Sequence, residues 1–99
     1  MPHDLVLAPE TSEHLESLDA GDRARVTDAI RTQLLRQPTV VTRHRKPLEA
    51  NPLATWELRA GRSSVFHDVH EGRTPVVEVL AVGVKNRAEV RIGGKVVKL

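Results

Sequence analysis

The chain has 99 residues with a net charge of +2, no cysteine and only two aromatic residues, Trp56 and Phe66. The absence of cysteine excludes a disulfide framework, thiolate metal sites and a cysteine nucleophile. No apolar run approaches the roughly 20 residues of a membrane helix, and the N-terminus lacks the basic-then-apolar order of a signal peptide. We therefore expect a single domain over residues 1–99, soluble, cytoplasmic and without a membrane attachment.

The N-terminal third of the chain predicts a short strand followed by two helices. Residues 4–7 form the strand candidate, which Pro9 closes. Thr11 or Ser12 is expected to cap a first helix that Gly21 ends. Asp22 is expected to cap a second helix, which stops before Pro38. The apolar residues of this helix have helical spacing. These are Val26, Ala29, Ile30 and Leu34. The short connection predicts a helical hairpin.

The rest of the chain predicts strands. Residues 40–54 are basic and punctuated by Pro47 and Pro52, which favours an irregular loop. Residues 56–59 and 64–69 alternate like two strands joined at Gly61, with Glu57 and Arg59 on the face opposite Trp56 and Leu58. Residues 76–83, "VVEVLAVG", have the nearly continuous apolar sequence of a central strand. Gly93-Gly94 between alternating apolar residues predicts a C-terminal hairpin.

This order predicts an α+β fold of two layers. The elements run β-α-α-β-β-β, with the helical hairpin on one face of an antiparallel sheet and an extra C-terminal β-hairpin. The other face of the sheet is left for function or for a partner. Residues 21–99 hold fifteen basic and eight acidic residues, a net charge of +7. Such a basic body suits a polyanion or an acidic protein partner, and an ordinary mixed surface explains it equally well.

Four segments in this order resemble the RelE/ParE superfamily of toxins from type II toxin–antitoxin systems. They are the β-α-α start, "TRHRKPLEANPLATWELRAG", "SSVFHDV" and "VVEVLAVGVKNRAEV". The resemblance implies a small basic toxin that a cognate antitoxin neutralises. RelE-like members cut messenger RNA on the ribosome without a metal or cofactor, whereas ParE-like members act on DNA gyrase and are not nucleases.

The resemblance also assigns site residues. RelE-like cleavage needs a base for the ribose 2′-hydroxyl proton, a cation for the phosphate charge and a proton donor for the leaving oxygen. Arg59, Lys85 and Arg91 are the predicted catalytic residues, and Arg91 stands where many relatives have a late tyrosine. Ser64 replaces an arginine, and the chain has no tyrosine. These departures leave a ParE-like toxin, or an inactive homologue that only binds antitoxin, as alternatives.

Further bases are candidates for contacts to the RNA backbone. They are Arg43, His44, Arg45, Lys46 and Arg87. The run around His44 is equally well explained as a solvated loop. His67 and Trp56 share faces with apolar residues and are expected to pack in the core. His67 and His70, three residues apart on a strand, do not point to one side and are not expected to form a metal pair.

Overall fold

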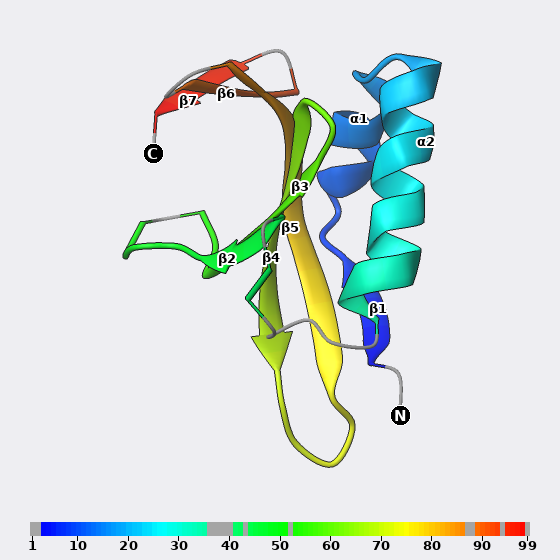
Figure 1. Cartoon of the computed structure of the whole chain (residues 1–99), viewed down its shortest axis with the longest axis vertical. Helices are drawn as coiled ribbons and strands as arrows, with labels where there is room; N and C mark the ends of the chain where they lie inside the picture. Colours follow the sequence, from blue (N-terminus) through cyan, green and yellow to red (C-terminus); the bar gives the residue numbers. More distant parts are fainter. Residues whose placement is uncertain are drawn as a thin grey trace.

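The computed structural model describes residues 3–35, 41–42, 44–51, 53–86, 89–93 and 95–98. Two α-helices pack on one face of a sheet, giving the two predicted layers (Figure 1). None of the helices in these ranges is long and apolar enough to cross a membrane. The elements, in chain order, are β1 (Asp4–Leu7), α1 (Thr11–Glu16), α2 (Ala20–Ala29), the π-helical turn η1 (Ile30–Leu34), β2 (Arg45–Pro47), β3 (Trp56–Ala60), β4 (Ser63–His70), β5 (Val76–Asn86), β6 (Glu89–Ile92) and β7 (Lys95–Lys98).

The sheet is an antiparallel meander with one parallel addition. Its order is β2-β3-β4-β5-β6-β7, and β1 pairs with β5 in parallel. The eleven-residue β5 is long enough to pair with β1 along residues 76–79 and with β6 along residues 83–86. This confirms the α+β fold, the helical hairpin on the sheet and the C-terminal hairpin. β2 is a correction, because an irregular loop was predicted there.

The boundary between the two helices differs from the prediction. No side chain caps α1, because the Thr11 hydroxyl donates instead to the carbonyl oxygen of Val79, at 3.1 Å. α2 begins earlier than expected, since the carboxylate of Asp19 accepts a hydrogen bond from the backbone N–H of Asp22, at 2.7 Å. Gly21 therefore lies in the first turn of α2 and does not end α1. Two aspartates three residues apart are equally good caps by type, and the extended backbone of Asp19 decides between them.

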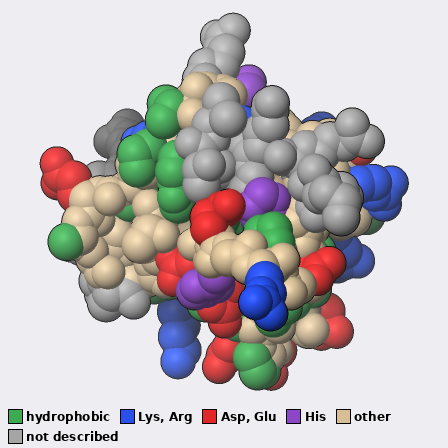
Figure 2. Space-filling view, turned by 90° about the horizontal axis from the view of Figure 1, so that it is seen from below, with side chains coloured by type: hydrophobic (Ala, Val, Ile, Leu, Met, Phe, Trp, Pro, Cys, Tyr) green, Lys and Arg blue, Asp and Glu red, His purple; other side chains and the backbone are tan. Residues whose placement is uncertain are grey.

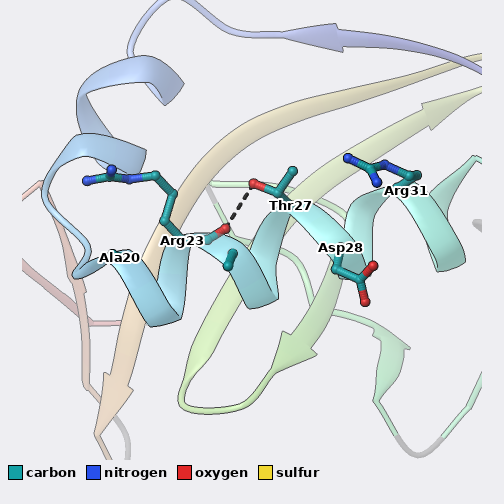
Figure 3. A pocket seen from close by; sticks show the side chains of 6 residues that line it. Ala20, Arg23, Thr27, Asp28 and Arg31 are labelled. Carbon is teal, nitrogen blue, oxygen red and sulfur yellow. Dashed lines mark hydrogen bonds between the residues drawn. The ribbon is translucent and has the colours of Figure 1, made fainter.

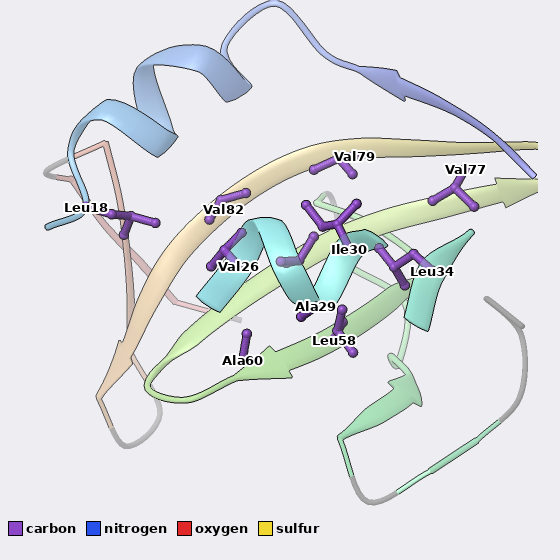
Figure 4. Close-up of a cluster of buried hydrophobic side chains, with 11 residues drawn as sticks. Leu18, Val26, Ala29, Ile30, Leu34, Leu58, Ala60, Val77, Val79 and Val82 are labelled. Carbon is purple, nitrogen blue, oxygen red and sulfur yellow. The ribbon is translucent and has the colours of Figure 1, made fainter. Parts of the chain in front are cut away.

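The main core lies between the helices and the sheet (Figure 4). The predicted apolar stripe of α2 and η1 supplies one side of it, and β3, β4 and β5 supply the other. Its buried members are Leu18, Val26, Ala29, Ile30, Leu34, Leu58, Ala60, Val65, Val77, Val79 and Val82. These residues confirm the amphipathic patterns of both layers.

A bulge in β5 keeps Val77 and Val79, before it, and Val82, after it, in this core. Phe66 pairs with Ala81 and His67 pairs with Val79, so Leu80 is the extra residue of β5. Without the extra residue, strict alternation would put Val79 and Val82 on opposite faces. With it, both lie in the core beneath the helices.

A second hydrophobic cluster covers part of the opposite face of the sheet. Phe66 and Ala81 lie at its centre, and the β6–β7 hairpin and the segment after β2 contribute the remainder. Its buried members are Ala54, Phe66, Ala81, Val90 and Ile92. The sequence suggested that the second face is left free for function or for a partner. The structure shows instead that this cluster covers part of the face, so only the remaining polar part is open.

Candidate functional site

The polar part of this second face is built by residues of three adjacent strands. We call the sheet face opposite α1 and α2 the open face. Arg59 pairs with Ser64, and Ser64 pairs with Gly83, so these positions share a face. By the two-residue alternation of strands, Glu57 and Lys85 lie on it too. β6–β7 and the segment after β2 extend from the sheet on this side and flank it (Figure 1).

Glu57 is the centre of the site. Its side chain is fully buried, and its carboxylate accepts a 2.6 Å hydrogen bond from the Ser64 hydroxyl. The Lys85 ammonium lies 3.4 Å from both carboxylate oxygens, and the Lys46 ammonium lies 4.0 Å from one of them. A buried carboxylate is tolerated only when it is paired and hydrogen-bonded, and this set of partners supplies both.

A cleft of about 360 Å³ opens above this carboxylate. Glu57 and Lys85 lie on one side of it, and the segment from Lys46 to Asn51 forms the other. The Asn51 side chain fixes that segment, because its carboxamide oxygen accepts from the N–H groups of Leu53 and Ala54 while its nitrogen donates to the carbonyl of Ala54. The wall of the cleft is thus held by its own hydrogen bonds.

This arrangement has defined chemical capabilities. A carboxylate shielded from bulk water can accept a proton from a hydroxyl that enters the cleft. Ammonium groups beside it can bind an anionic group such as a phosphate. The Lys85 side chain is 21% exposed and the Lys46 side chain is 58% exposed, so both cations reach solvent.

The structure brings two of the three predicted catalytic residues to this face. Lys85 contacts Glu57 directly. Arg59 lies two residues after Glu57 on β3. Its Nη2 donates to the carbonyl oxygen of Gly61 at 3.4 Å. The Arg59 Nε is buried and has no hydrogen-bond partner among the described residues. The strand register puts the backbone positions of Arg59 and Lys85 on one face. Arg59 does not line the cleft of Glu57; it lines a separate hollow at the edge of β3, together with Arg25 and Asp28 of α2. Its catalytic role stays a prediction.

Arg91 lies on the other face, so its predicted position beside the other two bases is wrong. Lys85 pairs with Val90, whereas Arg91 pairs with Val84. Paired residues share a face and neighbours along a strand do not. Arg91 therefore projects on the side of the helices, and the burial of Val90 with exposure of Arg91 agrees with this.

The basic loop residues separate into three groups. Arg45 is only 3% exposed, and its Nη1 donates to the carbonyl of Gln33 at 2.7 Å, so its predicted place in an exposed loop is wrong. It belongs to β2 and links the sheet to η1. His44 and Lys46 are exposed, as expected. Arg43 and Arg87 lie outside the described residues.

His67 is packed in the interior, as predicted. Its ring is fully buried and stacks on Trp56, with ring centroids 6.4 Å apart and planes at 23°. Trp56 and His67 are paired residues of β3 and β4. This packing favours a structural role for both.

The outer face of α2 carries a different hollow, which is less suited to chemistry. Arg23, Thr27, Asp28 and Arg31 follow one another along it (Figure 3). Arg23 is already engaged, because its guanidinium donates to the carbonyls of Leu15, Glu16 and Leu18 at the end of α1. No described side chain of this hollow is a buried, paired acid like Glu57.

Charged groups also fasten the β3–β4 turn to the start of α2. Arg62 donates to Asp22 at 2.7 Å and to Asp19 at 3.0 Å. The backbone hydrogen bond from Asp22, helped by the nearby Arg62 and Arg25, lowers the pKa of Asp19. Hydrogen bonding and attraction to Asp22, followed by attraction to Asp19, raise the pKa of Arg62. This network is structural, because it joins a turn to a helix N-terminus.

Glu57 and Ser64 are the residues that sequence reasoning did not assign to the site. The sequence patterns place Glu57 on the face of Arg59 without giving it a role, and they identify Ser64 only as a residue that stands where relatives have an arginine. A signal was present, since strand alternation already put Glu57 on the face of Arg59. A carboxylate in the middle of a predicted strand is uncommon and was the informative observation.

The fold defined by these elements is shared with bacterial toxins. A chain of the RelBE2 toxin–antitoxin complex from Mycobacterium tuberculosis has a TM-score of 0.72 and 22% identity, over 86% of this chain and 100% of its own. A YoeB/ParE toxin from Agrobacterium tumefaciens has a TM-score of 0.66 and 20% identity, over 84% of this chain and 99% of its own. No protein-family model matches the sequence, and no curated protein is detectably similar to it. The chain thus has the fold of RelE/ParE-type toxins, which agrees with the resemblance of its sequence to that superfamily.

Proposed function

We propose that this protein is the toxin of a type II toxin–antitoxin pair and that a cognate antitoxin neutralises it. The fold supports this proposal, because 86% of this chain matches the complete length of a chain from a toxin–antitoxin complex. The charge supports it as well, since residues 21–99 carry a net charge of +7 that suits an acidic partner and an RNA target.

The proposed activity is cleavage of messenger RNA on the ribosome, in the cytoplasm and without a metal ion. The observation that carries it is the fully buried Glu57 carboxylate at an open cleft beside Lys46 and Lys85. Glu57 takes the proton of a ribose 2′-hydroxyl, and the 2′-oxygen forms a bond to the adjacent phosphorus. The bond from phosphorus to the 5′-oxygen breaks, and that oxygen takes a proton from water. The hydroxide that this leaves takes the proton held by Glu57, so the carboxylate is restored. The products are a 2′,3′-cyclic phosphate and a 5′-hydroxyl end.

The basic residues have separate roles in this proposal. Lys85 and Arg59 stabilise the negative charge that develops on the phosphate. Lys46, which lines the cleft, holds the RNA backbone at its rim. His44, Arg43 and Arg87 are proposed as further contacts to the RNA backbone. Arg91 and Arg45 take no part in the reaction, since one lies on the opposite face and the other is buried.

A toxin that is not a nuclease is the alternative. Ser64 and Lys85 already occupy the Glu57 carboxylate, and a purely structural buried ion pair has the same appearance. The chain also has no tyrosine to donate a proton. Such a protein acts on DNA gyrase, as ParE-like toxins do, or only binds its antitoxin.

Controlled expression in a bacterial host tests the proposal. Wild type is expected to stop growth, and co-expression of its cognate antitoxin is expected to restore growth. Glu57→Gln and Lys85→Met should relieve the arrest, whereas Glu16→Gln, an exposed control in α1, should not. Arrest by both site variants, with a DNA-damage response, would favour gyrase as the target. No arrest by wild type would contradict the toxin assignment.

A further inference from the structure

A second cluster of polar side chains lies on the open face, at the end of β4 and the beginning of β5. Asp68 and Glu78 are directly paired across the two strands, and His70 follows two residues later on β4. One ligand atom from each residue lies within 4.8 Å of the other two. Figure 2 views the molecule from this end and shows histidine and acidic side chains gathered on it. The cluster is separate from the cleft of Glu57, which none of these three residues lines.

The three side chains are oriented toward one another and can be reached from solvent. The His70 Nε2 lies 3.2 Å from a Glu78 carboxylate oxygen, and their side chains are 58% and 35% exposed. Asp68 is held from the other side, because its Oδ1 accepts hydrogen bonds from the backbone N–H and the hydroxyl of Thr55, at 2.8 and 2.7 Å. The second oxygen of Asp68 is therefore presented in a fixed direction.

Among the described residues, His70 is the one basic side chain that pairs with a carboxylate of this cluster. Two carboxylates directly opposite each other in an antiparallel pair repel and destabilise the ladder. Within the described ranges, no lysine or arginine forms a salt bridge with Asp68 or Glu78. A cation placed between them would remove this repulsion.

We propose that Asp68, His70 and Glu78 bind one divalent transition-metal ion, with Zn²⁺ the best fit. One imidazole nitrogen and two carboxylate oxygens are donors that zinc accepts, with water in a fourth position. Donors around a tetrahedral zinc at about 2.1 Å lie roughly 3.4 Å apart, so small side-chain rotations complete the site. Mg²⁺ and Ca²⁺ prefer six or more oxygen ligands, which this set does not supply.

The ion would join β4 to β5 and takes no part in the proposed RNA cleavage, so this inference does not depend on the proposed function. The third ligand comes from β5, which explains why the spacing of histidines in the sequence does not reveal the site. His67 lies in the interior, paired with Val79, and cannot join His70.

Zinc titration of the full chain, prepared without a histidine tag and treated with EDTA, tests the inference. Calorimetry should give one Zn²⁺ per chain with a Kd below about 10 µM, and Zn²⁺ should raise the Tm while Mg²⁺ and Ca²⁺ should not. Co²⁺ should give the visible absorption of a tetrahedral site. His70→Ala and Glu78→Gln should each weaken zinc binding at least about tenfold. His44→Ala, which removes an exposed histidine elsewhere, is the matched control.

Two results would overturn the inference. One is the absence of stoichiometric zinc binding to wild type below about 100 µM. The other is zinc binding that is unchanged in both His70→Ala and Glu78→Gln. Because the His70 side chain is exposed and the Glu78 side chain is partly exposed and keeps its shape in glutamine, both variants should fold, and their circular dichroism spectra should match that of wild type.

Discussion

Replacing Gly83 by alanine should strongly destabilise the protein, because β6 passes very close to this position. An added Cβ would lie 2.6 Å from the carbonyl oxygen of Arg91, 2.8 Å from the Ile92 Cγ1 and 2.9 Å from the Val90 Cγ1. The two side chains are β-branched and stiff, and the carbonyl belongs to the backbone of β6, so no rotamer change relieves the overlap. Overpacking of this kind costs about 3 kcal/mol. Alanine also has less conformational freedom than glycine in the unfolded chain, which by itself would stabilise the folded protein by up to about 1 kcal/mol.

The net loss should be about 2 kcal/mol, which corresponds to a fall in Tm of roughly 8 to 16 °C for a domain of this size. Urea and thermal unfolding measure it. Gly21→Ala is the matched control, since its Cβ would make only ordinary contacts, 3.5 Å from Asp19 and 3.9 Å from Arg25. Because Gly21 lies in α2, the Gly21→Ala substitution should raise the free energy of unfolding by about 0.5 kcal/mol. A Gly83→Ala protein within about 0.5 kcal/mol of wild type would refute the close packing of β6 on β5.

Three further predictions concern stability. Leu58→Ala, at a fully buried core position, should cost about 2 to 5 kcal/mol in urea unfolding, and a loss below 1 kcal/mol would contradict that position. Lys85→Met should cost about 1 to 3 kcal/mol because Glu57 keeps its buried charge. Adding Glu57→Gln should recover part of this loss, and strictly additive effects would argue against the pair. The lowered pKa of Asp19 means that its charge stabilises the fold above its usual value of 3.8, and this contribution is lost as the pH falls through the folded pKa. The difference in unfolding free energy between wild type and Asp19→Asn should therefore be constant from pH 5 to 8 and vanish in stronger acid. A difference that persists in strong acid would contradict the stabilising role of the Asp19 charge.

Much of the fold follows from local sequence patterns. The apolar spacing of Val26, Ile30 and Leu34 predicts the helix that forms, and alternation predicts the inward face of Leu58 and Val65. These signals depend on neighbours along the chain, so they can be recognised without tertiary information. The Gly93-Gly94 hairpin is of the same kind, and the backbone of Gly93 indeed has a positive φ of 58°.

Features that depend on pairing between distant segments were not predictable. The bulge at Leu80 lies in a run where almost every residue is apolar, so alternation cannot locate it. The three residues of β2 are a strand only because they pair with β3. Arg91 is adjacent in sequence to a residue of the open face, and only the register with β5 shows that it lies on the other side.

The candidate site was partly predictable for the same reason. Alternation along β3 predicts that Glu57 and Arg59 share a strand face, which agrees with the register, and the catalytic role that the resemblance implies for Lys85 stays a prediction. The contact of Lys85 with Glu57 spans 28 positions in the sequence and follows from the β3-β4-β5 order. Glu57 changes from an ordinary strand acid to the centre of a site only when this contact is known.

The central claim is that Glu57, beside Lys85, makes this protein a ribosome-dependent nuclease. The most direct test is to translate a defined messenger RNA in a purified system and to map its 5′ ends with wild type, Glu57→Gln and the control Glu16→Gln. Wild type and the control should produce discrete new ends bearing 5′-hydroxyl groups only when ribosomes are present. Loss of a general base lowers such rates by about 10² to 10⁴, so Glu57→Gln should produce almost none. Equal cleavage by Glu57→Gln, or no cleavage by wild type, would contradict the account.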